Sequence, residues 1–477
     1  MPKIYVYLWF DVEDYVSRES DDPPLIFVNI LKKCNVPVTC KLVSEKVRAL
    51  IEHGRSDVIS AISDCDVGSH SDTHSQHPTV WEYLADLDVA SGAKEFMSRE
   101  ERGLKLLSEV FHRTPSCYGH PGVMWAPHAY PALREMGIPV YLDETGILNL
   151  DDQPYWYCGV LNLNGAGQNL IRFDYSFEKP SGIVSMKSKF NRIYRRLHKG
   201  NGGAVSILLH PQTAVNKKMW DVVNFARGKN RAKDQYERPP AQPRKVTERA
   251  YVQFEEFIRY VSSFEDVQWI TASDAAKIYQ RPAEISLERN EWAQVVKHFL
   301  ASQSYMKVQH DILSPAEGFY LVTMCLAQYG DTGTLPDQIT VREPLGPMAT
   351  ARTKGKKTFH TKDFIATTKS ASVFMNSENC IPTSLSVGDY VEVSPHDFLA
   401  TACKLLGSII SAGAPPDKMA LIKGAPPQTD HLSISDFKKD CEWVVLPRNF
   451  RAPKIFEQAK LQAWTLKPAI PKTDEID

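Results

Sequence analysis

The chain has 477 residues, of which 43% are hydrophobic and 24% charged, and its formal net charge at pH 7 is −1. This length is too great for one compact core, and the composition is that of an ordinary globular protein, so two or three domains are expected. The balanced charge gives no indication of nucleic-acid binding, and no apolar run approaches the ~18 residues of a membrane span.

The start of the chain and its cysteines favour one compartment. The N-terminus leads directly into an apolar run at Ile4, without the basic, apolar and small-residue regions of a signal peptide. Nine cysteines, an odd number without a CxxC pair, indicate buried thiols in a reducing compartment rather than a disulfide framework. We therefore expect a cytoplasmic protein.

Strand and helix patterns alternate through the first part of the chain. The predicted strands cover residues 4–10, 36–42, 66–70, 140–143, 204–209 and 267–271. The predicted helices cover residues 24–33, 43–52, 81–111, 250–263 and 272–279. Such alternation predicts a parallel α/β fold, with functional residues at the carboxyl ends of the strands.

The first predicted strand runs directly into three carboxylates, Asp11, Glu13 and Asp14. Crowded like charges cost free energy unless a cation or a proton relieves the repulsion. Strand alternation places Asp11 and Glu13 on one face and Asp14 on the other. A solvated acidic loop is the structural alternative.

A histidine pair follows the third predicted strand. His70 and His74 are four residues apart, so one helical turn would direct both rings to the same side, where they can share a metal ion. Neutral imidazole suits zinc and its first-row neighbours. The alternative is a pair of surface histidines at a helix start that Ser71 or Asp72 caps.

A third histidine ends another buried strand. His210 follows residues 204–209, and Pro211 closes the strand, which delivers an imidazole to the carboxyl edge of the sheet. Together with the carboxylates and the histidine pair, this predicts a metal site with a separate acid and base.

The order of these motifs, Phe10–Asp14, His70–His74 and Leu208–His210, resembles the polysaccharide deacetylase superfamily (NodB homology domain, carbohydrate esterase family 4). The Asp-Val-Glu-Asp-Tyr opening is similar to the subgroup that replaces the usual Thr-Phe-Asp-Asp-Gly. The resemblance covers residues 1–282 and implies a distorted (β/α)7 barrel of NodB type.

The resemblance also implies a division of roles. Asp11 would be the general base that activates a metal-bound water, and His210 the general acid that protonates the leaving amine. The ligands of one divalent metal would be His70, His74 and either Glu13 or Asp14. Zinc is the first choice, with cobalt, nickel and manganese as alternatives. A Lewis-acidic metal would stabilise the oxyanion while base and acid move protons on opposite sides.

The third motif departs from the superfamily. An arginine that orients the base is expected shortly before a proline, but Gly119 stands at that position. His120 is expected to line the substrate site instead, and Arg113 is the second candidate to approach the base. Asp143 resembles the later aspartate that tunes the catalytic pair, although a strand-end aspartate is as often a turn residue. The departure leaves the usual chitin or peptidoglycan specificity open.

Two features predict loops over the site. Trp125 and Trp156 would suit stacking on a sugar ring, and burial in the core is the alternative. A basic, proline-rich insertion over residues 225–244 would form either a lid that holds an anionic substrate group or a solvated loop.

Residues 283–477 predict a smaller, mainly helical domain with degenerate repeats. Phe364 and Phe398, each preceded by an aspartate, are both followed eighteen positions later by a proline, and residues 314–341 form a looser copy. Each unit predicts a capped helix, a Gly/Pro turn and a short extended segment. The pattern resembles pseudomurein-binding repeats. Repeats that only pack on the barrel are the alternative.

These observations favour a metal-dependent hydrolase that removes an N-acetyl or similar acyl group from an amino-sugar-containing glycan or glycoconjugate. Two other functions remain open. One is hydrolysis of small cyclic or linear amides, possible without a metal since some superfamily members act in this way. The other is a non-catalytic glycan-binding protein, which would have no need of an acid, a base and a metal together.

Overall fold

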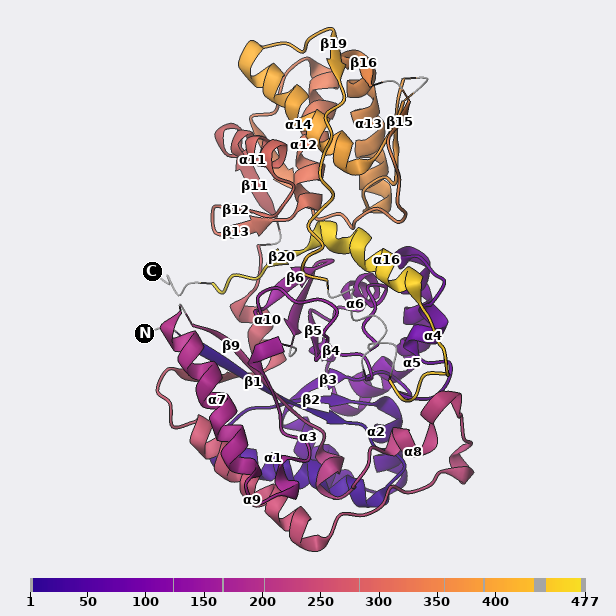
Figure 1. The fold of residues 1–477 in the computed structure, drawn as a ribbon, viewed down its shortest axis with the longest axis vertical. Coiled ribbons are helices and arrows are strands. Elements are labelled where there is room, and N and C mark those ends of the chain that lie inside the picture. Colours follow the sequence, from indigo (N-terminus) through magenta and orange to yellow (C-terminus); the bar gives the residue numbers. More distant parts are fainter. Residues whose placement is uncertain are drawn as a thin grey trace.

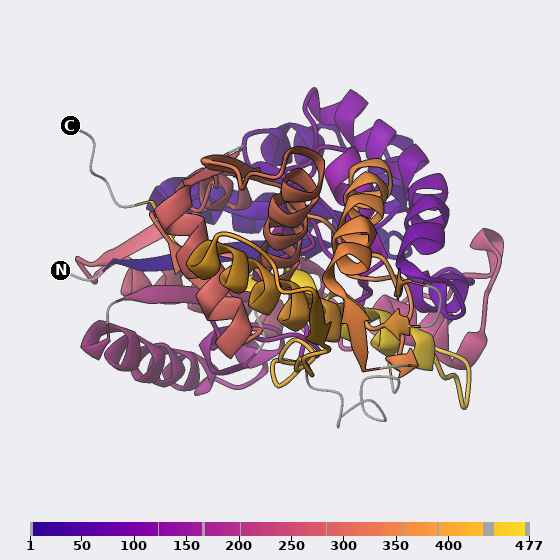
Figure 2. The ribbon, with the colours of Figure 1, turned by 90° about the horizontal axis from the view of Figure 1, so that it is seen from above.

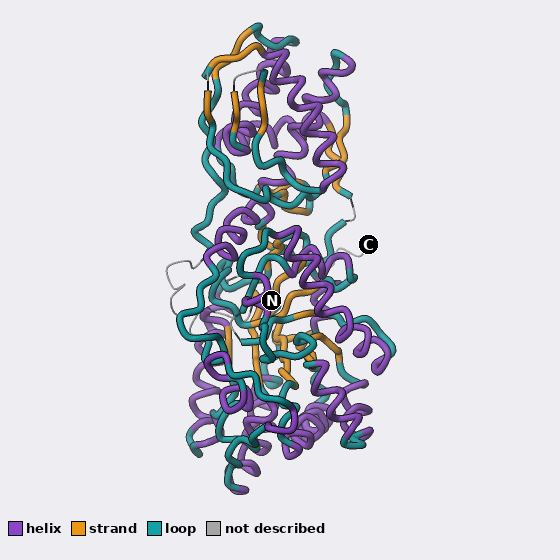
Figure 3. Tube along the Cα trace, turned by 90° about the vertical axis from the view of Figure 1, so that its right-hand side faces the viewer, coloured by secondary structure: helices purple, strands orange, loops and turns teal. Residues whose placement is uncertain are grey.

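The computed structural model describes residues 3–472 except 123, 165–166, 201, 283, 356, 389–390 and 433–442. An α/β part and a mainly helical part lie one above the other, with helix α16 (Pro453–Gln462) between them (Figure 1). The elongated arrangement is also clear from the side (Figure 3).

The central strand is β1 (Ile4–Val12), and all nine of its residues are buried. It pairs in parallel with β9 (Gly203–Leu209) on one side. On the other side, β10 (Val267–Ile270) pairs with its first half and β2 (Thr39–Leu42) with its second half. Buried side chains on both faces suit a strand whose outer face helices cover and whose inner face packs against other strands of the curled sheet.

The sheet continues outward from this centre. Its order is β20-β6-β7-β5-β4-β3-β2-β1-β9-β8. The remaining strands are β3 (Asp66–Ser69), β4 (Cys117–Tyr118), β5 (Val140–Asp143), β6 (Tyr155–Tyr157), β7 (Val160–Asn164), β8 (Leu170–Arg172) and β20 (Lys467–Pro468). Among the described residues the two ends of this curled sheet do not pair with each other. The expected α/β fold with a distorted barrel is therefore confirmed.

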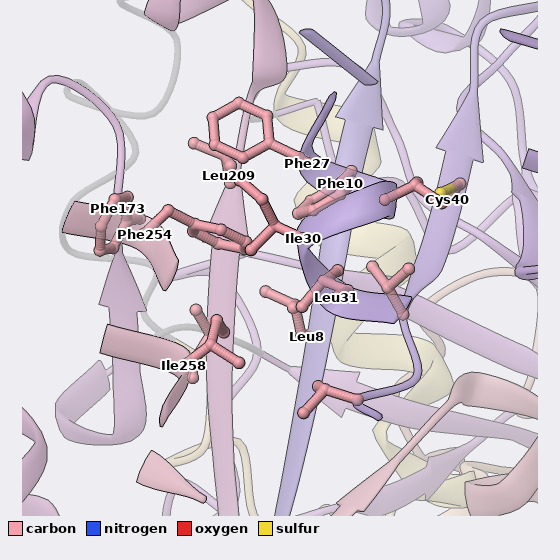
Figure 4. Packing of buried hydrophobic residues seen from close by; sticks show 14 of the residues in the cluster. Leu8, Phe10, Phe27, Ile30, Leu31, Cys40, Phe173, Leu209, Phe254 and Ile258 are labelled. Carbon is pink, nitrogen blue, oxygen red and sulfur yellow. The ribbon is translucent and has the colours of Figure 1, made fainter. Parts of the chain in front are cut away.

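Helices cover the outer face of the sheet and close its core. They are α1 (Asp22–Cys34), α2 (Ser44–Glu52), α3 (Ser56–Ser63), α4 (Val80–Leu84), α5 (Val89–Phe111), α6 (Ala129–Glu135), α7 (Gly182–Lys199), α8 (Trp220–Asn224), α9 (Arg244–Val261) and α10 (Ala272–Ile278). Phe10 of β1 packs against Phe27 of α1 and Phe254 of α9, with ring centroids 6.0 Å apart in both pairs (Figure 4). This packing fixes the end of β1 from which the acidic motif emerges.

The prediction of a single long helix over residues 81–111 was wrong. The chain forms α4 and α5 with a break at residues 85–88. The Asp88 carboxylate accepts a hydrogen bond from the amide of Ser91 at 2.7 Å and caps α5. An aspartate in this role stabilises a new helix start, which apolar periodicity does not reveal.

The mainly helical part has its own apolar core, and three of its helices share a common pattern. Helices α12 (Pro315–Thr332), α13 (Thr361–Glu378) and α14 (Pro395–Ala412) each have 18 residues and end at a left-handed residue. Each helix precedes a short strand: β14 (Gln338–Val341), β17 (Leu385–Val387) or β19 (Lys418–Ala420). Seen from above, the helices lie over the barrel (Figure 2). The resemblance to pseudomurein-binding repeats stays a prediction.

Six further short strands and a helix complete this part. They are β11 (Ile285–Glu288), α11 (Arg289–Ala301), β12 (Met306–Val308), β13 (Asp311–Leu313), β15 (Lys354–Gly355), β16 (Thr358–His360) and β18 (Val391–Val393). They form two-stranded and three-stranded sheets outside the barrel, such as β11 with β14. They therefore extend the repeat units rather than the central sheet.

The last described residues return to the barrel. Strand β20 pairs antiparallel with β6, and Ile455 and Phe456 of α16 share an apolar cluster with Trp81. The domain boundary expected at residue 282 stays a prediction, but the chain beyond it contributes to the core of the first part.

Two findings bear on the compartment. No helix of the described part of the chain combines the length and apolar character that crossing a bilayer requires. The eight cysteines that the structure describes are unpaired, and Cys441 lies outside the described residues. The cytoplasmic location stays a prediction.

A buried ion-pair network joins the two parts, and it supports a prediction about stability. Glu317 of α12 accepts from Arg281 at 2.7 Å and from Lys467 of β20 at 2.6 Å. Burial raises the pKa of Glu317, but the two cations outweigh burial and leave the pKa below its usual value. We expect Glu317→Gln to cost about 3 kcal/mol at neutral pH, because the buried Lys467 and the largely buried Arg281 each lose a partner. Thermal unfolding measures the loss.

The matched control is Asp331→Asn on the same helix, where the Lys369–Asp331 pair is exposed and is expected to contribute less than about 1 kcal/mol. The stabilisation from Glu317 is present above its unfolded pKa of about 4.3 and is lost as the pH falls through the lower folded value. The difference between Glu317→Gln and the wild type should therefore shrink at acid pH. Equal unfolding midpoints for both variants at neutral pH would contradict this role.

Candidate functional site

Three side chains that could hold a metal ion converge at the carboxyl edge of the sheet. Glu13 follows β1, and His70 and His74 follow β3. Glu13 Oε2 lies 3.0 Å from Nε2 of His74 and 3.4 Å from Nε2 of His70. The three potential ligand atoms lie within 4.8 Å of one another, and all three residues are buried. One carboxylate and two imidazoles are a donor set that fits zinc and its first-row neighbours.

A turn, and not a helix, brings the two histidines together. Ser71 and His74 have φ values of 71° and 57°, which a helix does not allow, and the His74 amide donates to Ser71 Oγ at 3.0 Å. The helical turn expected over His70–His74 was therefore wrong. The ring centroids are nevertheless 5.1 Å apart, because the turn directs both side chains toward β1.

Neighbouring groups fix the orientation of these three side chains. Nδ1 of His70 lies 2.9 Å from the carbonyl oxygen of Gly119, and Nδ1 of His74 lies 2.6 Å from Ser75 Oγ. Gln212 Nε2 donates to Glu13 Oε1 at 2.8 Å, and Trp220 Nε1 donates to the same oxygen at 3.2 Å. Because these contacts occupy the far atoms of the three side chains, both Nε2 atoms and Glu13 Oε2 face one another. Hydrogen bonds from surrounding groups orient metal ligands in the same way.

Asp14 lies apart from this group. Its carboxylate accepts hydrogen bonds from the amides of Val16 and Ser17 and from Asn216 Nδ2 at 2.8–3.0 Å. Asp14 lies beyond the end of β1, and these contacts turn its carboxylate away from Glu13.

Asp11 lies beside the three converging side chains and has a cationic neighbour. Its Oδ2 lies 3.8 Å from His70 Nε2 and 3.6 Å from His210 Nε2, and its Oδ1 lies 3.1 Å from Lys41 Nζ. Burial raises the pKa of Asp11, but Lys41 and the two imidazoles outweigh burial, so the pKa lies below its usual value. The carboxylate is therefore ionised and able to accept a proton.

Lys41 was not identified from the sequence. It is fully buried in β2, and its Nζ also lies 3.8 Å from Asp143 Oδ1. It places a positive charge 3.1 Å from Asp11 Oδ1. The one signal was a lysine within an otherwise apolar predicted strand over residues 36–42, since a fully buried lysine requires a partner.

Arg113 does not reach the base. Its guanidinium donates to the carbonyl oxygens of Ser63 and Cys65 on the protein surface, so its expected approach to Asp11 was wrong. His120 is fully buried, and its Nδ1 lies 2.9 Å from the Tyr141 hydroxyl, which donates to Asp143 at 3.0 Å. His120 thus reaches Asp143 only through Tyr141.

His210 is held by an aspartate that the sequence did not reveal. Asp174, which follows β8, lies 2.7 Å from Nδ1 of His210 and also accepts from the His210 amide at 2.7 Å. Burial lowers the pKa of His210, but Asp174, Glu13 and Asp11 outweigh burial and raise it to about 10. Nε2 of His210 faces Asp11, so a protonated imidazole and an ionised carboxylate stand side by side.

The predicted aromatic contacts lie elsewhere. Trp125 is 1% exposed, and its Nε1 donates to the Tyr130 hydroxyl within an apolar cluster, so it occupies the core. At the junction of the two parts, the Arg281 guanidinium lies over the Trp156 ring, with Cζ 5.9 Å from the ring centroid.

The insertion over residues 225–244 contains only short helical turns before α9 begins at Arg244.

Comparisons with known proteins give distant structural similarities. No protein-family model and no curated protein matches the chain. Similar solved structures include proteins described as polysaccharide deacetylases from Mycobacterium smegmatis (15% identity, 58% of this chain and 90% of that one, TM-score 0.37) and from Pseudomonas aeruginosa PAO1 (14%, 59% and 92%, 0.39). Another is Puue allantoinase (14%, 58% and 90%, 0.39).

Proposed function

We propose that the chain is a metal-dependent hydrolase that removes an N-acetyl or similar acyl group from an amino-sugar-containing glycan or glycoconjugate. The observation that carries the proposal is the meeting of Glu13, His70 and His74 beside Asp11 and His210. A ligand set, a base and an acid at one sheet edge are the parts that hydrolysis of an amide requires.

The chain's own residues account for the proton movements. Asp11 accepts a proton from the water whose oxygen attacks the acyl carbon. His210 donates its Nε2 proton to the nitrogen as the carbon–nitrogen bond breaks, so the products are a carboxylic acid and a free amine. Asp174 keeps His210 in the orientation that directs Nε2 into the site. A divalent cation held by Glu13, His70 and His74 would lower the pKa of the attacking water and stabilise the developing oxyanion.

A metal-free amide hydrolase is the second candidate. The observation that favours it is the 3.0 Å distance between Glu13 Oε2 and His74 Nε2. A direct contact between the two side chains, without a metal ion between them, would explain this distance as well. A chelator separates the candidates. Loss of deacetylation after chelation and recovery with zinc supports the metal-dependent enzyme. Undiminished hydrolysis of a cyclic amide by metal-free protein supports the second candidate.

Elemental analysis of two neighbouring variants tests the metal site. Glu13→Gln should lose stoichiometric metal, because the amide replaces the one anionic ligand of the set. Asp14→Asn is the matched control and should keep the metal, since Asp14 faces Ser17 and Asn216. If Glu13→Gln holds as much metal as the wild type, this site is rejected. If Asp14→Asn alone loses the metal, Asp14 is the ligand.

A further inference from the structure

A tryptophan from the far end of the chain lies against the proposed metal site. The Trp443 ring is 5.8 Å from the His74 ring between centroids, at an interplanar angle of 76°. It also packs over Gly122, where a Cβ atom would come within 2.6 Å of the indole. Gly122 follows the third motif and has a φ of +57°, so glycine suits both the backbone and this close approach.

The segment around Trp443 is attached to the barrel. The amides of Arg227 and Gly228 donate to the carbonyl oxygens of Val444 and Val445 at 2.7 and 3.0 Å. Val445 is fully buried in an apolar cluster with Trp220, which donates to Glu13. In Figure 1 this yellow segment, ahead of α16, lies beside α8. Trp443 is therefore held in place by backbone contacts and not by its own ring alone.

Trp443 also keeps surface for a ligand. The residue is partly exposed, whereas its neighbours His74 and Trp220 are buried. No residue of the described part of the chain accepts a hydrogen bond from its Nε1. A partly exposed indole at the rim of a polar site, with a donor that has no partner among the described residues, is suited to a ligand with an apolar face and hydroxyl groups.

We infer that Trp443 is a specificity-determining residue that stacks on a hexopyranose ring of an N-acetylated glycan substrate. This inference rests on the proposed function. A pyranose presents C–H bonds on its face and hydroxyl groups at its edge, which match the indole face and Nε1. The residues after the helical repeats would thus complete a substrate site whose catalytic groups come from the first 210 residues.

Steady-state kinetics with two substrates test the inference. N-acetylated hexosamine oligomers probe the sugar contact, and 4-nitrophenyl acetate probes the acyl transfer alone. Trp443→Ala should raise KM for the oligomers about tenfold, as truncation of an aromatic side chain that contacts a ligand does, and leave kcat, metal content and ester hydrolysis unchanged. Trp443→Phe should recover part of the loss. Trp269→Ala is the matched control, because Trp269 is partly exposed at the opposite end of β1 and pairs there with Val6.

Each other outcome has a defined meaning. An unchanged KM, or an equal loss on ester and oligomer in Trp443→Ala, overturns the sugar contact. Metal-dependent ester hydrolysis by a wild-type protein that neither binds nor deacetylates the oligomers also overturns it, while the hydrolase chemistry stands. A wild-type protein that hydrolyses neither substrate rejects the proposed function itself.

Discussion

Asp11→Asn is expected to lower turnover of the N-acetylated substrate by on the order of a hundredfold or more, because an amide cannot accept the proton that the attacking water loses. The substitution preserves shape, so the carbonyl oxygen of the new amide can still face Lys41 Nζ, which lies 3.1 Å from Asp11 Oδ1. The variant should therefore fold and bind substrate, and the loss should appear in kcat. Steady-state kinetics on the isolated, folded variant measure it.

Asp14→Asn again provides the control, since it makes the same chemical change three residues away, beyond the end of β1. It should retain turnover in the folded fraction. Metal content of Asp11→Asn should stay stoichiometric, which separates loss of the base from loss of the ligand set. Near-normal turnover in Asp11→Asn would remove Asp11 from the proton transfer and with it the proposed mechanism.

His210→Gln is expected to cause a comparable loss on the amide substrate, but its effect should depend on the leaving group. An amine departs only when its nitrogen receives a proton, whereas 4-nitrophenolate departs without one. Glutamine can still donate to Asp174, a buried carboxylate that otherwise would lose this partner and keep the hydrogen bond from Arg172 Nε. Comparing rates on the N-acetylated sugar and on 4-nitrophenyl acetate therefore isolates the acid role from general damage.

The double variant Asp11→Asn/His210→Gln extends this test. The two losses should not add fully, because both groups serve one sequence of proton transfers. Asp174→Asn should lower turnover less than His210→Gln, since the imidazole remains but its orientation is less firmly held. An equal rate reduction on the amide and on the ester in His210→Gln would show that His210 does not protonate the leaving group.

The sequence alone predicted those residues of the proposed catalytic centre that directly follow a recognisable strand. Asp11 and His210 each follow a buried strand, and the carboxyl ends of parallel strands meet at one edge of a sheet. The period of two in a strand predicted different faces for Glu13 and Asp14 but left the choice of metal ligand between them open. The backbone turn at His70–His74 was not predictable in this way, because the spacing of four fits a helix as well as the observed turn.

The tertiary structure alone identified the groups that surround this centre. Lys41, Asp174 and Trp443 come from β2, from the end of β8 and from the chain ahead of α16, and no local pattern marks them as neighbours. Their roles depend on distances across strands and between the two parts of the molecule, such as 2.7 Å from Asp174 to His210. The sequence thus determined the strands, their acidic and histidine ends and hence the class of site. Packing decided which charges and rings surround it, because burial and pairing depend on contacts between segments that are distant along the chain.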